Sequence, residues 1–126
     1  MTLNRLLMLQ MAYAFAGIMY NVGSLLAQRL DQEPWAPTDA VIGVAVVSLY
    51  GLFLSAGVMK NLLLYRLLMG VSVIVLGYGG VVAHLQNVGQ MELYHSVWTW
   101  AGAIGINSIG LLLNLTAAFG WYVRRV

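Results

Sequence analysis

Four long apolar runs that contain no Asp, Glu, Lys or Arg constrain this chain more than any other feature. They cover approximately residues 6–26, 40–59, 67–83 and 97–123. A helix that crosses the hydrocarbon core of a bilayer needs about 20 predominantly apolar residues, and the runs have about this length. The sequence therefore predicts an all-α polytopic membrane protein, in which residues 1–126 form one integral membrane domain with four transmembrane helices in an up-down-up-down bundle.

Composition excludes the main alternatives. Of the 126 residues, 61% are hydrophobic and only 8% are charged, whereas a soluble domain carries about 25% charged residues. Disordered chains are polar, so disorder is excluded as well. The chain has no cysteine, which removes disulfides, thiolate metal sites and cysteine nucleophiles. Because the sequence also carries none of the common catalytic motifs, we expect a protein that is not an enzyme.

The basic residues divide unevenly between the two predicted ends of the bundle. Only Arg29 falls on the end that also carries the acidic residues Asp31, Glu33 and Glu92. Because cytoplasmic loops carry an excess of Lys and Arg, we expect both termini in the cytoplasm and the protein in a bacterial inner membrane. The residues expected to anchor the cytoplasmic side at the membrane surface are Arg5, Lys60, Arg66, Arg124 and Arg125.

Neutral polar residues form a regular stripe in the first and fourth spans. In the first span they recur, together with small residues, at alternating spacings of four and three, which keeps them on one helix face. The fourth span repeats this pattern around two asparagines. The stripe residues, which either pack helices together or line a path, are Gln10, Asn21, Ser24, Gln28, Asn107 and Asn114.

The two remaining spans offer weaker patterns. In the third span Gly70, Gly77, Gly80 and His84 are predicted to share one helix face. The second span offers the small residues Ala45, Ser48 and Ser55 for the same purpose. Since lipid provides no hydrophobic force between helices, helix interfaces in membranes collect small residues that allow close backbone approach. These faces are therefore expected to be packing surfaces.

Two functions follow from these patterns. The first is a small non-catalytic subunit that assembles through its small and polar helix faces, with itself or with a larger membrane complex. The alternative is a small oligomeric channel or transporter with a path lined by Asn, Gln and Ser. The absence of acidic residues inside the spans favours packing, because proton-coupled transporters usually carry a titratable group at depth. The expected partners are lipid and membrane subunits, and no nucleic acid.

A third function depends on the histidines near the outer face. His84 ends the third span and His95 begins the fourth, and Glu92 precedes His95 by three residues. Imidazole and carboxylate groups are good ligands for zinc, copper or a haem metal, so a redox or cofactor-binding subunit is an open alternative. Structural hydrogen bonding is the more ordinary role, and otherwise no cofactor is expected. Thr38 or Asp39 is predicted to cap the second helix.

Overall fold

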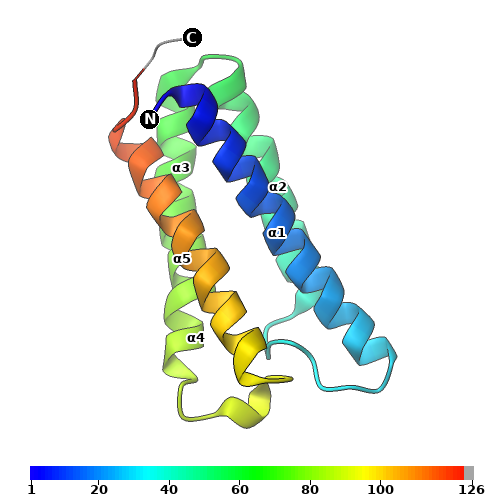
Figure 1. Ribbon diagram of the computed structural model, residues 1–126. Helices are drawn as coiled ribbons and strands as arrows, with labels where there is room; N and C mark the ends of the chain where they lie inside the picture. Colours follow the sequence, from blue (N-terminus) through cyan, green and yellow to red (C-terminus); the bar gives the residue numbers. More distant parts are fainter. Residues whose placement is uncertain (124–126) are drawn as a thin grey trace.

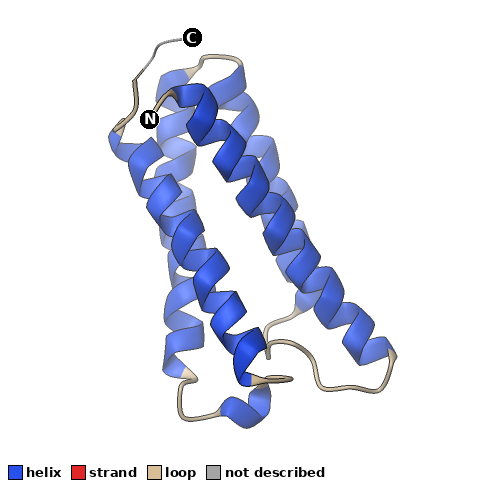
Figure 2. Ribbon diagram, in the orientation of Figure 1, coloured by secondary structure: helices blue, strands red, loops and turns tan. Residues whose placement is uncertain are grey.

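Helices make up nearly all of the computed structural model, which describes residues 1–123 (Figure 1). No strand is present in that range (Figure 2). Short irregular segments, one of them containing a single turn of 3₁₀ helix, connect the long helices. The elements are α1 (Leu3–Arg29), α2 (Ala40–Val58), α3 (Leu62–Gly77), the π-helix η1 (Tyr78–Val82), α4 (Ala83–Gln86), the 3₁₀ turn η2 (Met91–Leu93) and α5 (Val97–Phe119).

Four helical segments are long and apolar enough to cross a membrane, which confirms the predicted all-helical protein with four spans. The third of them joins α3, η1 and α4 into one segment, Leu62–Gln86. Large apolar side chains such as Met8, Ile74 and Trp98 are mostly exposed on the outside of the bundle. A soluble monomer rarely exposes so much contiguous apolar surface, whereas lipid solvates it. The chain is therefore an integral membrane protein.

Side-chain caps fix where the second and third spans begin. Asp39 Oδ1 accepts hydrogen bonds from the backbone N–H groups of Val41 and Ile42, at 2.9 and 3.1 Å, so the predicted cap of α2 is confirmed. The Asn61 side chain caps α3 in the same way. The third span therefore begins at Leu62, before the approximate start at residue 67, and Arg66 lies within α3.

The fourth span is shorter than predicted. Gly120 has φ +72° and terminates α5 at Phe119, rather than at residue 123. Glycine favours this left-handed position because other residues meet a steric penalty from their Cβ there. The Arg66 Nε group donates to the carbonyl of Ala118 at 3.0 Å, so this basic residue also satisfies the C-terminal end of α5. Positive charge is favourable at this end of a helix.

The four long helices form a closed ring in which α1 contacts α2 and α5, while α3 contacts the same two helices. Thr2 pairs with Val123, so the beginning of α1 lies beside the segment after α5. The connection between α2 and α3, which contains Lys60, lies at this same end (Figure 1). Arg124 and Arg125, which were predicted to anchor this end, lie outside the described residues.

The π-helix η1 shifts the buried face of the third span by one residue. Before it, the buried side chains are Tyr65, Met69, Ser72 and Leu76, whereas Gly77, Gly80 and His84 are buried from Gly77 onward. A π-turn inserts one extra residue into a helix, which explains the shift. The predicted face is therefore correct from Gly77 onward. Gly70, at its other end, is only partly buried.

Candidate functional site

Apart from Gln28, the polar stripe of α1 and α5 faces the interior of the bundle, but it divides into separate groups of residues. Gln10 and Asn114 are completely buried in the half of the bundle that contains the beginning of α1. Asn21 and Asn107 are partly buried in the other half. The sequence pattern places these four residues on one face and does not distinguish the two environments. The contacts that each side chain makes in the structure do distinguish them.

Gln10 and Asn114 belong to a hydrogen-bonded cluster that joins all four long helices. The Gln10 amide donates from Nε2 to Asn114 Oδ1 at 3.1 Å and to the Met69 sulfur at 3.1 Å. The Tyr50 hydroxyl donates to Asn114 Oδ1 at 2.7 Å, and the Tyr65 hydroxyl donates to Gln10 Oε1. We call these five residues the polar node. Apart from Asn114 Nδ2, every buried side-chain nitrogen and oxygen of residues 1–123 has a hydrogen-bond partner.

The polar node is covered on one side by Tyr13, which stands between α1 and α5. Its ring packs edge-on against Tyr50, with centroids 5.3 Å apart, and its hydroxyl donates to Asn107 Oδ1 at 3.3 Å. The ring lies so close to the backbone of Gly110 that a Cβ there would overlap it. The node and this ring fill the centre of the bundle, so the interior is closed at this level.

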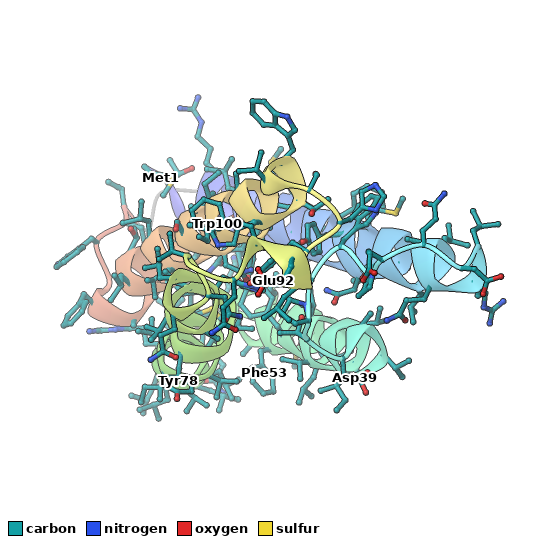
Figure 3. The ribbon with its side chains drawn as sticks, turned by 90° about the horizontal axis from the view of Figure 1, so that it is seen from below. Met1, Asp39, Phe53, Tyr78, Glu92 and Trp100 are labelled. Carbon is teal, nitrogen blue, oxygen red and sulfur yellow. The ribbon has the colours of Figure 1, made fainter. Side chains whose placement is uncertain are left out.

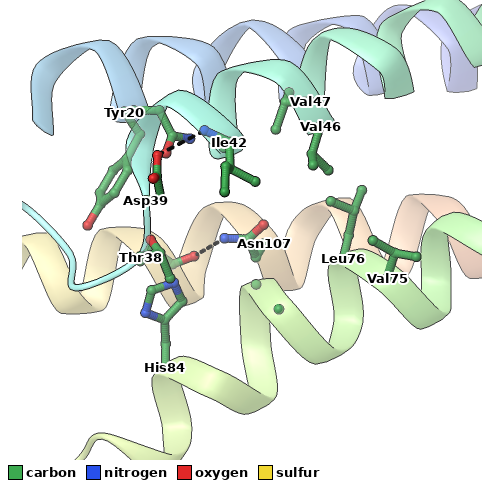
Figure 4. Close-up of a pocket in the computed structure, with 15 residues that line it drawn as sticks. Tyr20, Thr38, Asp39, Ile42, Val46, Val47, Val75, Leu76, His84 and Asn107 are labelled. Atoms are coloured by element: carbon green, nitrogen blue, oxygen red, sulfur yellow. Dashed lines mark hydrogen bonds between the residues drawn. The ribbon is translucent and has the colours of Figure 1, made fainter. Parts of the chain in front are cut away.

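Beyond Tyr13 the helices leave a cleft of about 330 Å³ (Figure 4). Its sides include Ile42 of α2 and Val75 of α3, which are 61% and 52% exposed, whereas Ala103 and His84 at its back are 2% and 4% exposed. The cleft therefore opens sideways between α2 and the third span. Figure 4 shows Thr38, Asp39 and His84 at one end of the cleft and valine and leucine side chains at the other.

Asn21 and Asn107 line this cleft from α1 and α5 in equivalent ways. Each amide donates from Nδ2 to the backbone carbonyl four residues earlier in its own helix, at 2.8 Å. Each also lies against a glycine of the neighbouring element, Gly43 of α2 or Gly80 of η1, where a Cβ would overlap the amide. The two glycines therefore provide the space in which the asparagine amides sit at the wall of the cleft.

His84 presents one ring nitrogen to the cleft and fixes the other. Its Nδ1 lies 2.7 Å from the hydroxyl of Tyr94, and the Asn87 amide donates to the same hydroxyl at 3.3 Å. Because the Tyr94 hydroxyl has no other acceptor among the described residues, its proton goes to Nδ1, and the ring then carries its hydrogen on Nε2. His84 thus offers an N–H donor to a molecule in the cleft.

Ser24 has a different role from the rest of the stripe. Its hydroxyl accepts a hydrogen bond from the backbone N–H of Trp35 at 3.0 Å, and the Trp35 ring packs closely against Gly23. Tyr20 contacts the same connection and also donates to the carbonyl of Thr99 at 2.7 Å. Ser24 therefore holds the connection between α1 and α2 against the bundle. Gln28, the last residue of the predicted stripe, is exposed.

The three candidate metal ligands do not form one cluster. Within residues 1–123, no three His, Cys, Asp or Glu side chains come together in an arrangement that could hold a metal. Glu92 and His95 do not lie on one helix either, because η2 ends at Leu93. The His95 backbone N–H instead donates to the carbonyl of Pro34 at 2.9 Å, which joins the two connections at this end of the bundle.

The small residues of the second span do not face the interior of this chain. Ala45, Ser48 and Ser55 are all exposed, while Val47, Tyr50 and Leu54 face the interior. Hydroxyl groups in a membrane helix can be satisfied by the backbone of the same helix. The Ser55 hydroxyl, for example, donates to the carbonyl of Leu52 at 2.6 Å.

Sequence reasoning did not identify Tyr50, Tyr65 and Met69 as partners of the stripe. Tyrosines in membrane proteins are enriched at the membrane boundary, yet Tyr65 is fully buried inside the bundle. A useful signal was available, because the buried amides of Gln10 and Asn114 require hydrogen-bond partners.

No family model, curated protein or solved structure matches the chain. The assignment of a function therefore depends on the polar node and the cleft.

Proposed function

We propose that this chain is a non-catalytic integral membrane protein that binds a small amphipathic molecule in the cleft. In this proposal its spans cross a bacterial inner membrane in up-down-up-down order with both termini in the cytoplasm. The single observation that carries the functional proposal is a cleft with hydrogen-bonding groups at one end and apolar walls at the other. Binding sites for small molecules usually combine apolar walls with a few placed polar groups.

The chemistry of the lining supports an amphipathic ligand. At the polar end, His84 offers a donor, while Asn21 and Asn107 present amide groups along the wall. At the other end, Val46, Val75 and Leu76 provide apolar contact. A molecule dissolved in the membrane can reach the cleft sideways, between α2 and the third span. When the molecule enters the cleft, its polar part leaves the membrane surface and forms hydrogen bonds with the polar groups of the lining.

The polar node argues against a continuous solute path through a single chain. The amides of Gln10 and Asn114 are bonded to each other and to two tyrosines, and they have no exposed surface. The same contacts place the small faces of α1 and α5 inside this chain, where they are not available to another copy. The proposal therefore keeps the non-catalytic membrane protein of the sequence-based hypotheses, and it puts ligand binding in the place of transport and assembly.

Gly79 provides a test of the cleft. Gly79 lines the cleft, and space for a Cβ is open at this position, so we expect Gly79→Trp to fold and to obstruct the opening. Two probes are used, (3-phenoxypropyl)trimethylammonium and its uncharged isostere 4,4-dimethylpentyl phenyl ether. We expect Gly79→Trp to lower the affinity of the protein for at least one of them by tenfold or more. Each probe carries an ether oxygen that can accept the N–H of His84. Equilibrium dialysis of the detergent-solubilised protein measures the affinities.

Gly70→Trp is the matched control. Gly70 lies in the same span, has open space at its Cβ position and does not line the cleft. Binding to this variant should remain within twofold of the unmodified protein. The proposed function is wrong if neither probe shows binding that is sensitive to Gly79→Trp, or if the two tryptophan variants behave alike.

A further inference from the structure

A single charged side chain lies among the described residues that line the cleft. Among the described residues that line it, Asp39 is acidic and none is Lys or Arg. Only one of its carboxylate oxygens, Oδ1, accepts the two backbone hydrogen bonds that cap α2. The second oxygen, Oδ2, is not used by any hydrogen bond among residues 1–123. It remains available to a ligand at the polar end of the cleft.

Asp39 lies at an end of the bundle that carries other acidic residues. All four acidic residues of the chain lie at the end of the bundle where the cleft has its polar groups, and among residues 1–123 Arg29 is the one Arg or Lys at that end. The four negative charges and one positive charge of these described residues sum to a formal charge of −3. Figure 3 views the molecule from this end, where Glu92 and Asp39 lie on neighbouring connections. A surface of one sign attracts ligands of the opposite sign and raises their local concentration.

The ring of His84 adds a second, independent group that can bind a ligand in the cleft. It is 4% exposed, and its Nε2 has no hydrogen-bond partner among the described residues. Figure 4 shows the ring at the same end of the cleft as Asp39 and Thr38. A ligand that places a positive group near Asp39 and an acceptor oxygen near Nε2 satisfies both side chains. An anion would find no Lys or Arg among the described residues that line the cleft, and it would lie beside the Asp39 carboxylate.

We propose that the ligand of the cleft is an amphipathic organic cation, with its positive nitrogen at Asp39, an acceptor oxygen at His84 and its apolar part against the valines of α2 and α3. This inference rests on the proposed function. The attraction between the ligand and Asp39 is stronger at the edge of a membrane than in bulk water, because the surrounding dielectric constant is lower. It weakens as salt is added.

Asp39→Asn tests the charge without removing the helix cap, because Asn and Asp are equally good at this position. We expect it to lower the affinity for (3-phenoxypropyl)trimethylammonium roughly tenfold, which corresponds to about 1.4 kcal/mol. The affinity for the uncharged 4,4-dimethylpentyl phenyl ether should change less than twofold. Asp31→Asn is the matched control, because Asp31 lies at the same end and does not line the cleft.

The outcomes separate this inference from the proposed function. If both probes bind in a manner sensitive to Gly79→Trp, and Asp39→Asn leaves both affinities unchanged, the cleft binds ligands but the inference about charge is wrong. Equal loss of cation binding in Asp31→Asn and Asp39→Asn would also overturn it, since the effect would then come from the whole surface. If neither probe binds, the proposed function itself fails.

Discussion

Gly110→Ala should destabilise the protein by about 1 to 3 kcal/mol relative to Gly105→Ala, although both substitutions place one methyl group on α5. A Cβ at position 110 overlaps the buried ring of Tyr13, whereas position 105 has open space. Overpacking of a filled interior typically costs about 1–3 kcal/mol, and each substitution gains about 1 kcal/mol of helix propensity. The propensity gain cancels in the comparison, so the difference measures the contact between α1 and α5.

Unfolding in detergent by increasing mole fractions of dodecyl sulfate, followed by circular dichroism, measures this difference. Gly105→Ala should be as stable as the unmodified protein or slightly more so. Equal stability of the two variants would show that α1 and α5 do not approach as closely as Tyr13 and Gly110 do here.

We expect Asn114→Ala to have the second large effect, a loss of about 2 kcal/mol. The substitution removes the acceptor of the Tyr50 hydroxyl and one of the two acceptors of the Gln10 amide. A buried donor without a partner costs about 1–3 kcal/mol. Interhelical hydrogen bonds in membranes contribute less, on average about 0.6 kcal/mol, because the unfolded chain also finds partners in the membrane. The expected total of about 2 kcal/mol is the sum of the cost of the lost hydrogen bonds and the cost of the small cavity that the shorter side chain leaves.

A double-mutant cycle with Tyr50→Phe isolates the hydrogen bond from the cavity. If Asn114 and Tyr50 interact directly, the double variant should be more stable than the sum of the single effects predicts, by about 0.5 to 1.5 kcal/mol. Ser108→Ala, on the same helix and outside the polar node, should change stability by less than about 0.5 kcal/mol. Additive effects in the cycle would contradict the node.

Periodicity predicted the spans and much of the interior because both depend on simple geometry. Four apolar runs require four helices, and spacings of three and four residues require that Gln10, Asn21, Ser24, Asn107 and Asn114 share the inner faces of α1 and α5. The structure places all five inside the bundle. Asp39 was predictable as a cap because its type and its place before an apolar run are typical of helix starts.

The rest depends on interactions between distant residues. The amide of Gln10 meets the amide of Asn114, whereas the amide of Asn21 lines a cleft. Which of these occurs depends on how far apart the helices lie at each level of the bundle. The shift at η1 follows from one extra residue in the π-helix Tyr78–Val82, which no periodicity reveals. The inner face of α2 was missed because it is formed by Val47, Tyr50 and Leu54, which a search for small residues passes over.

The central claim is that the interior of one chain is open in the half that contains the cleft and closed at the polar node. Two alanines on the same face of α5 test it, Ala103 at the back of the cleft and Ala117 beyond the node, both almost completely buried. The chain has no cysteine of its own, so Ala103→Cys and Ala117→Cys can be labelled singly with 2-(trimethylammonium)ethyl methanethiosulfonate.

The account predicts that the folded Ala103→Cys protein is labelled at least tenfold faster than the folded Ala117→Cys protein, and that the two rates become equal after unfolding in dodecyl sulfate. Equal rates in the folded proteins would contradict the account. If both were fast, the interior would be open through the node; if both were slow, the cleft would be inaccessible.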